Sequence, residues 1–305
     1  MRNAFARVMT ELAQERSDVC LLSGDIGNRM FDRYKEVAPT RFLNCGIAEA
    51  NMMSMAAGMA LSGLRPVVYT ITPFTTTRCL EQIRTGVAYH EAPVVIVGTG
   101  SGLSYAELGA THHSLEDLAI LRCIPNLQVC APSDSLELKS QLKEAIDKGI
   151  PTYIRIGKKG EPNLFENEKE LGIGKANLIK PGDDIILLGI GPIISEGLKA
   201  RELLMSEGIT MAVASMGSVK PLDTKFLRWC LSNKYKHWIT LEEHHVTGGL
   251  GSAVVEWLST RSDHSVSVKR IGVEDQFIHE LGPQAYVREK IGLSSQSIKK
   301  LIQEL

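Results

Sequence analysis

The stretch Asp18-Val-Cys-Leu-Leu-Ser-Gly24 places four apolar residues directly before a serine and a glycine. A short apolar run that ends in this way is typical of a strand buried in a parallel sheet. Helical patterns flank it, at 3–15 before it and at 48–62 after it. Strand and helix patterns then alternate along nearly the whole chain, which predicts mostly parallel sheets with helices on both faces.

The alternation continues through the first half of the chain. Strands are expected at 67–71, 94–98, 127–131 and 152–156, and helices at 75–90, 114–121 and 133–148. Ser114 and Ser133 begin the last two helical patterns, and serine is a favoured N-cap residue. We therefore expect these two serines to cap the helices.

The segment 157–180 interrupts the alternation, because it carries glycine, proline and many charges without a clear period. Beyond it the pattern restarts, with strands expected at 184–189, 210–214, 238–242 and 266–271. We predict two doubly wound α/β domains, 1–165 and a smaller one at 181–305, joined by a linker at 166–180.

The composition is that of an ordinary globular protein. Of 305 residues, 34 are Lys or Arg and 35 are Asp or Glu, so the net charge is −1, and 44% are hydrophobic. This balance argues against nucleic acid as a ligand, and no apolar run approaches the ~20 residues that span a bilayer. The six cysteines are scattered without a CxxC pair, and the first residues lack the apolar core of a signal peptide. We expect a cytoplasmic protein with reduced thiols.

Residues that follow strands are the first functional candidates, because doubly wound sheets bind ligands beyond the carboxyl ends of their strands. Gly24-Asp-Ile-Gly27 and Gly98-Thr-Gly-Ser-Gly102 lie there, and neither is a GxGxxG fingerprint. Each is explained by a tight turn, and the second is alternatively a site where main-chain N–H groups bind an anion. Glu49 falls in the first turn of a helix, where the helix dipole favours a carboxylate, or it is a surface charge. His112, on a loop, is either a proton-transfer group or structural.

The run Glu242-Glu-His-His245 brings four potential metal ligands together. Adjacent residues of a strand point to opposite faces, however, and no third ligand follows at a useful spacing. We therefore expect no metal ligand in this chain. Spacing alone indicates a two-domain α/β protein with a candidate site near Glu49 and His112, and it does not name a reaction.

Six motifs, taken in order, resemble the C-terminal two-thirds of transketolase and of its relative 1-deoxyxylulose-5-phosphate synthase. The motifs are Arg41-Phe-Leu-Asn-Cys-Gly-Ile-Ala-Glu49, Gly109-Ala-Thr-His-His-Ser114, Leu121-Arg-Cys-Ile-Pro-Asn126, Ala131-Pro-Ser-Asp134, Gly217-Ser-Val-Lys-Pro-Leu-Asp223 and Leu241-Glu-Glu-His-His-Val-Thr-Gly-Gly-Leu-Gly-Ser252. They cover nearly the whole chain. The resemblance implies a pyrimidine-binding domain followed by a smaller transketolase C-terminal domain.

The resemblance also implies thiamine diphosphate as the cofactor. Glu49 matches the glutamate that hydrogen-bonds a ring nitrogen of the aminopyrimidine and so promotes deprotonation of the thiazolium carbon. Phe74 takes the place of the aromatic residue that stacks on the pyrimidine. Asp25 and Ile26 match, more loosely, a pair that lines the pyrimidine pocket. His112 matches the histidine that contacts the substrate oxygen and assists proton transfer.

One family motif is missing. The family holds the diphosphate and its divalent metal with a GDG sequence and an asparagine further along, and Gly24-Asp-Ile26 and Gly182-Asp-Asp184 both fail this pattern. The chain also begins at the helix that opens the pyrimidine-binding domain. We therefore expect a second chain, an N-terminal transketolase subunit that binds the diphosphate and Mg²⁺ or another divalent ion, in an α2β2 assembly.

The substrate positions depart from the family pattern. Leu108 stands where transketolases have an aspartate that reads a sugar hydroxyl, and Gly100-Ser101 stand where relatives place a basic residue for the acceptor phosphate. Arg2 and Lys158 match phosphate-contacting positions, and Arg29 replaces a phosphate-binding serine. The resemblance thus implies an anionic substrate bound by a different arrangement of charges. Each of these three basic residues is equally well explained as solvated surface.

The sequence is thus interpreted as the C-terminal subunit of a split transketolase, which transfers a two-carbon ketol unit from a phosphorylated ketose to an aldehyde. Glu49 and His112 are the expected catalytic residues. Three alternatives remain open at this point: the beta-type subunit of a 2-oxo-acid dehydrogenase, a decarboxylative deoxyxylulose-phosphate-type synthase, and a non-catalytic interaction module.

Overall fold

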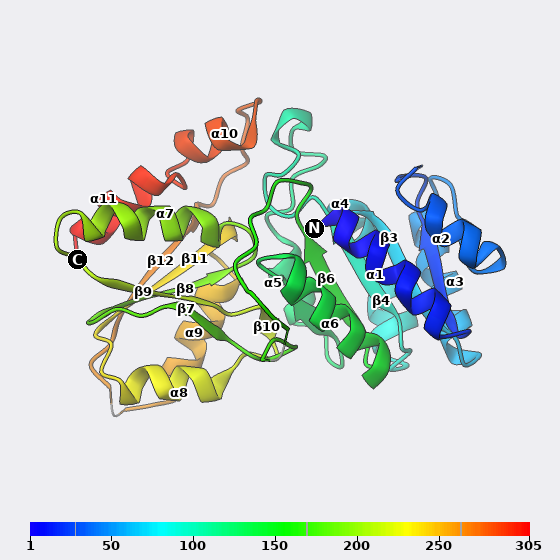
Figure 1. The fold of residues 1–305 in the computed structure, drawn as a ribbon, viewed down its shortest axis with the longest axis horizontal. Helices are drawn as coiled ribbons and strands as arrows, with labels where there is room; N and C mark the ends of the chain where they lie inside the picture. Colours follow the sequence, from blue (N-terminus) through cyan, green and yellow to red (C-terminus); the bar gives the residue numbers. More distant parts are fainter. Residues whose placement is uncertain (28, 169, 263) are drawn as a thin grey trace.

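The computed structural model describes residues 1–27, 29–168, 170–262 and 264–305. It contains two sheets side by side, each covered by helices, with the N-terminus near the junction between them (Figure 1). The larger sheet has the strand order β10-β5-β6-β4-β3-β1-β2, and the smaller has the order β12-β11-β8-β9-β7. The expected class, two α/β domains with mostly parallel sheets, is confirmed.

The first domain supplies six strands of the larger sheet, and all of these pair in parallel. They are β1 (Val19–Ser23), β2 (Phe42–Asn44), β3 (Arg65–Ile71), β4 (Val95–Thr99), β5 (Gln128–Cys130) and β6 (Thr152–Ile156). The helices are α1 (Arg2–Glu15), α2 (Asp32–Val37), α3 (Glu49–Leu61), α4 (Thr72–Thr75), α5 (Asp117–Arg122) and α6 (Ser135–Lys148).

Successive side chains of the central strands point to opposite faces of this sheet, and each face has its own core. Leu21 and Tyr69 pack in the core that α1 and α6 cover, whereas Leu22 and Val68 pack in the core that α3 covers. The strands are buried on both faces, which explains why they appear as continuous apolar runs in the sequence.

The helix expected at 75–90 is not continuous. After α4 come a 3-10 turn at Thr77–Cys79 and a π-helical segment at Gln82–Ala88. Three threonine hydroxyls bond backward to main-chain carbonyls here; that of Thr76, for example, donates to Thr72 O at 2.7 Å. Such local bonds compete with regular helix formation, and β-branched residues are weak helix formers.

The two expected serine caps are wrong. Ser114 forms an isolated bridge with Gly102, and α5 begins three residues later with Glu116 at its N-cap position. At α6 the cap is Asp134, whose carboxylate accepts the main-chain N–H groups of residues 136 and 137 at 2.9 Å. The neighbouring Ser133 hydroxyl instead pairs with Ser215 Oγ, at 2.7 Å.

The second domain carries the smaller sheet. Its strands are β7 (Asn177–Lys180), β8 (Ile185–Ile190), β9 (Met211–Ser215), β11 (His237–His245) and β12 (Ser267–Val273). Its helices are α7 (Ile194–Met205), α8 (Thr224–Ser232), α9 (Leu250–Ser259), α10 (Gln284–Lys290) and α11 (Ser295–Gln303). The predicted linker at 166–180 needs correction, because its last four residues form β7, an edge strand antiparallel to β9. Among the described residues, no helix combines the length and the apolar character needed to cross a membrane.

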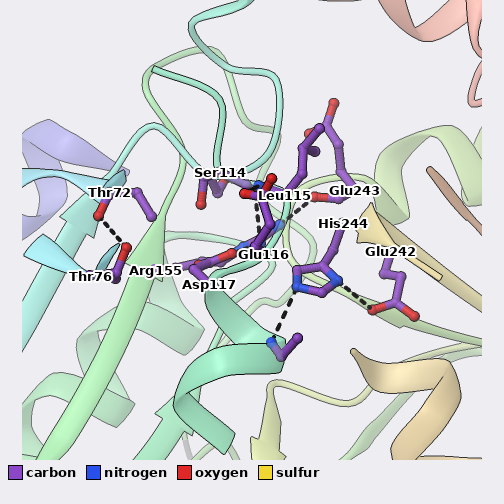
Figure 2. Close-up of polar contacts among 12 residues, drawn as sticks. Thr72, Thr76, Ser114, Leu115, Glu116, Asp117, Arg155, Glu242, Glu243 and His244 are labelled. Atoms are coloured by element: carbon purple, nitrogen blue, oxygen red, sulfur yellow. Dashed lines mark hydrogen bonds and ion pairs between the residues drawn. The ribbon is translucent and has the colours of Figure 1, made fainter. Parts of the chain in front are cut away.

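The domains also share structure. Strand β10 (Ser218–Lys220) follows β9 in the chain but pairs antiparallel with β5, at the edge of the first domain's sheet. Between the sheets, the buried Arg155 of β6 donates to Asp117 Oδ1 and to the carbonyl of Glu243 in β11, each at 2.7 Å (Figure 2). One guanidinium therefore bonds both domains.

Candidate active site

Glu49 is the first residue of α3 and is only 4% exposed. It follows a turn in which Gly46 has φ +67°, a conformation that favours glycine. The carboxylate has a charged partner, because Arg78 Nη1 donates to Oε1 at 2.8 Å. A buried carboxylate at a helix N-terminus, held by one arginine, can serve as a polar anchor for a nitrogen base.

Phe74 lies in α4, just beyond the carboxyl end of β3, and is partly exposed. The Arg78 guanidinium stacks over its ring, with Cζ 4.0 Å from the ring centroid. Arg78 reaches this position from the 3-10 turn at Thr77–Cys79. The same guanidinium thus contacts both Glu49 and Phe74, which lie far apart in the sequence.

His112 lies on the loop that follows β4, and its ring packs edge-on against Phe74 with the ring centroids 5.3 Å apart. Its Nδ1 is 2.9 Å from Thr111 Oγ1. Burial, and to a lesser extent the charge of Arg78, lowers the pKa of His112 below its ordinary value. The imidazole is therefore neutral at pH 7 and can accept a proton from a neighbouring group.

Tyr105 extends the cluster toward Lys158. Its ring centroid lies 6.0 Å from that of His112, and Lys158 Nζ lies 4.6 Å from it. Tyr105 also explains the glycine at position 100: with φ +91°, a Cβ there would lie 2.3 Å from the tyrosine ring. No side chain can occupy position 100 while Tyr105 keeps this place.

Four other predicted residues lie near the same ends of the strands. Asp25 is exposed after β1 and accepts a hydrogen bond from Asn44 of β2 at 2.9 Å. The carbonyl of Ile26 accepts a bond from Ser23, which fixes the turn. Burial raises the pKa of the Tyr69 hydroxyl, and the charge of Arg2, at the start of α1, offsets part of that rise. Arg29 is exposed on the turn before α2.

The structure therefore brings together Glu49, Phe74, His112 and Lys158, and two linking residues were missed. Arg78 was missed because it reaches Glu49 from a 3-10 turn, which the continuous helix expected at 75–90 did not include. The only sign of the position of Tyr105 in the sequence is Gly100, because a residue without a side chain there leaves room for the tyrosine ring.

The residues of Glu242-Glu-His-His245 each have protein partners. Glu242 accepts the first N–H groups of α9 at 2.7 and 2.8 Å, and burial raises its pKa to about 7. Glu243 pairs with Arg288 at 2.7 Å. His244 Nε2 accepts the Ala119 N–H of α5, and burial lowers the pKa of this histidine to about 4 (Figure 2). Within the described residues, no group of three or more His, Cys, Asp or Glu side chains is arranged to hold a metal ion.

Comparison with known proteins identifies the family to which the chain belongs. The family model described as "Transketolase, pyrimidine binding domain" matches residues 1–161, and "Transketolase, C-terminal domain" matches residues 174–298. The chain therefore belongs to the transketolase family of thiamine-diphosphate-dependent transferases.

Several relatives are, by name, single subunits of a transketolase. The chain is 34% identical to a subunit of the apulose-4-phosphate transketolase of Phocaeicola vulgatus, over 90% of this chain and 88% of the relative. It is 33% identical to the 6-deoxy-6-sulfo-D-fructose transketolase subunit SqwH of a Clostridium species, over 100% and 94%. It is 35% identical to 1-deoxy-D-xylulose-5-phosphate synthase of Aquifex aeolicus, but spans only 48% of that protein.

Solved structures agree. A split gene transketolase, solved as an inactive beta4 tetramer, superposes with a TM-score of 0.88 at 32% identity, covering 99% of this chain and 96% of the other. Transketolase of Pichia stipitis has the same fold, with a TM-score of 0.82 at 19% identity, and this chain covers 45% of it. The expected resemblance to a split transketolase subunit is confirmed.

Proposed function

We propose that this chain is the pyrimidine-binding subunit of a split transketolase that moves a two-carbon ketol unit from a ketose to an aldehyde. The observation that supports this function is the convergence of Glu49, Phe74 and His112, which come from three separate segments. Arg78 links the first two, and the rings of Phe74 and His112 pack directly. The division into domains at 1–165 and 181–305 is part of the proposal, and we extend the second domain to residue 177 so that it includes β7.

These residues fit the aminopyrimidine end of thiamine diphosphate. A planar, nitrogen-bearing group already bonds Glu49 and stacks on Phe74, since the Arg78 guanidinium does both. In our proposal Glu49 hydrogen-bonds the pyrimidine ring, Phe74 stacks on it, and Asp25 and Ile26 line its pocket. The cofactor, when bound, supplies the nucleophilic carbon and the electron sink for breaking and forming the C–C bond.

His112 is the proposed proton-transfer residue on the substrate side. Its neutral ring packs between those of Phe74 and Tyr105. Arg2, Arg29 and Lys158 are the proposed contacts for an anionic substrate group. Two relatives, named for a sugar phosphate and for a sulfo-sugar, support an anionic substrate. The Leu108 side chain cannot form a hydrogen bond with a sugar hydroxyl, so we propose a sugar preference that differs from that of ordinary transketolases.

A partner subunit completes this proposal. It would carry the GDG motif and asparagine, bind the diphosphate and Mg²⁺, and form an α2β2 heterotetramer with this chain in the cytoplasm. The split gene transketolase of known structure supports dependence on a partner, because its tetramer of beta chains alone is described as inactive. The chain alone should therefore bind the cofactor weakly and turn over no substrate.

The test begins with mild affinity purification of the tagged chain from its own host. We expect a stoichiometric second chain carrying the GDG motif, with thiamine diphosphate bound, and cleavage of ketose phosphates without release of CO₂. A lone, cofactor-free homo-oligomer would refute the partner proposal. Release of CO₂ from a 2-oxo acid would refute ketol transfer and support one of the decarboxylating alternatives.

Two substitutions test the residue roles in the purified complex. Glu49→Ala should abolish turnover and leave assembly intact, whereas Glu81→Ala, which removes an exposed carboxylate of the same region, should change neither. More than a few per cent of residual activity in Glu49→Ala would refute its role. His112→Ala should slow turnover with the cofactor still bound, and loss of cofactor in this variant would show that His112 has been assigned wrongly.

A further inference from the structure

Arg78 makes two contacts at once, and both are with residues that we propose to bind the cofactor. Its Nη1 donates to the Glu49 carboxylate at 2.8 Å, and its guanidinium plane lies over the Phe74 ring with Cζ 4.0 Å from the ring centroid. A guanidinium is flat and carries N–H donors in its plane. The aminopyrimidine would need the same two features, because in our proposal the Glu49 carboxylate bonds its edge and the Phe74 ring stacks on its face.

We propose that Arg78 is a latch on the cofactor site: in the unloaded subunit its guanidinium takes the place between Glu49 and Phe74 that the aminopyrimidine occupies later. The incoming ring must displace it. This inference rests on the proposed function, because it uses the assignment of Glu49 and Phe74 to the cofactor. It adds an element that the proposed function does not require, a group that competes with the cofactor from within the chain.

The exposures of the two partners determine which one moves. The Glu49 side chain is 4% exposed and fixed in the first turn of α3, whereas the Arg78 side chain is 45% exposed. Arg78 can therefore turn toward water, where a guanidinium is well solvated, and Glu49 stays in place. A buried carboxylate without a partner is costly, so the latch also keeps Glu49 compensated until the cofactor arrives.

The neighbourhood of Arg78 changes when the latch opens. The charge of Arg78 contributes, after burial, to the lowered pKa of His112. Displacement of the guanidinium removes that contribution, so the histidine becomes a stronger base as the cofactor enters. Buried Cys79, the next residue, stays a neutral thiol throughout, because burial raises its pKa to about 12.

The experiment compares the affinity of five forms, the wild type and four variants, for thiamine diphosphate with Mg²⁺, by calorimetry on the full chain together with its copurified partner. Arg78→Met removes the guanidinium and keeps an apolar side chain. The incoming cofactor then has no Arg78–Glu49 bond to break, and the Glu49 carboxylate has no cation beside it. We expect the Kd to fall about tenfold, equivalent to about 1.4 kcal/mol, which is in the range of one charge-assisted hydrogen bond. Arg84→Met, the matched control, removes an exposed arginine that pairs with Glu81, and its Kd should not change.

Arg78→Lys is the second variant, and it guards against a folding defect in Arg78→Met. Lysine can keep the charge pair with Glu49 but cannot stack as a plane, so its Kd should lie between those of the wild type and Arg78→Met. A second readout needs no turnover: the gain in Tm on adding thiamine diphosphate should be larger for Arg78→Met than for the wild type. Both measurements report on cofactor binding alone.

The latch is overturned if Arg78→Met binds the cofactor with unchanged or weaker affinity, since weaker binding would make Arg78 a cofactor ligand. It is also overturned if neither the wild type nor Arg78→Met binds. Glu49→Gln separates this outcome from failure of the proposed function. An unchanged Kd for Glu49→Gln would show that the cofactor does not use this site, whereas weakened binding by Glu49→Gln with no gain in Arg78→Met would refute the latch alone.

Discussion

Arg155 is the polar centre of the contact between the domains, and its replacement by methionine tests how strongly they are coupled. The side chain is 1% exposed. It bonds Asp117 of the first domain and the Glu243 carbonyl of the second, each at 2.7 Å. Methionine fills much of the same volume but makes neither bond, so Asp117 is left buried without its cation.

The structure sets the magnitude of the effect. Removing one partner of a buried ion pair costs about 3–5 kcal/mol, because the remaining charge is uncompensated. Asp117 keeps one strong partner, the Tyr153 hydroxyl, which donates to Oδ2 at 2.6 Å. We therefore expect a loss near the lower end, about 3 kcal/mol. At about 2 °C per kcal/mol for a chain of this size, the Tm should fall by about 6 °C.

The assay uses the distribution of tryptophan. All three tryptophans, Trp229, Trp238 and Trp257, lie in the second domain, so their fluorescence reports on its unfolding, while far-UV circular dichroism reports on both domains. In the wild type the two transitions should coincide, as expected for cooperative unfolding. In Arg155→Met they should separate, since the buried hydrogen bond from Arg155 to the Glu243 carbonyl is gone.

Two further variants control for simple loss of charge. Arg122→Met removes an ion pair between the domains. Its partner Glu256 is exposed, so loss of the pair should lower the free energy of unfolding by less than about 1 kcal/mol. Adding Asp117→Asn to Arg155→Met should recover part of the lost stability, because the buried charge is neutralised. A Tm for Arg155→Met within about 1 °C of the wild type, with coincident transitions, would refute this account of the domain junction.

The remaining predictions concern strain and titration. Gly100→Ala should lower the unfolding free energy by about 2 kcal/mol, because φ is +91° and Tyr105 blocks the Cβ; Gly46→Ala, with open space, should cost less. Burial raises the pKa of Glu137 to about 7, so the folded chain holds a proton that the unfolded chain loses above about pH 4.5. The free energy of unfolding should therefore fall as the pH rises from about 4.5 to about 7. Glu137→Gln should flatten that slope in urea titrations, and an unchanged slope would contradict it. The pKa of His244, lowered to about 4 by burial, predicts a loss of stability as pH falls from 6.5 to 4, and a ring titration by NMR near 6.5 would disprove it.

The central strands could be predicted because burial on both faces leaves a strong pattern. The run expected at 152–156 matches β6 to the residue, since each of its side chains is buried. Edge elements carry weaker signals. Strand β7 has alternating, half-buried residues inside a charged segment, and β10 is a three-residue pairing between domains, so neither carries a continuous apolar run.

The candidate site could not be assembled from spacing, because its members are brought together by the topology of the sheet. Glu49, Phe74 and His112 follow different strands, and only the family resemblance groups them. The break in the 75–90 helix has a physical cause that is visible in the sequence, the run of threonines at 75–77, whose hydroxyls bond back to main-chain carbonyls. Without that break, Arg78 would be expected on a regular helix rather than in the turn from which it reaches Glu49.

The second domain does more than complete a core, because it holds the loop that carries His112. Arg155 Nη1 also donates to the Ser114 carbonyl at 3.3 Å, and the His245 N–H of β11 donates to the Leu115 carbonyl at 2.9 Å. The chain just after His112 is therefore bonded to the end of β11 and to Arg155. For this reason Arg155→Met should lower kcat at temperatures well below its Tm, with cofactor affinity retained. Full wild-type kcat in that variant would show that the histidine loop keeps its position without Arg155.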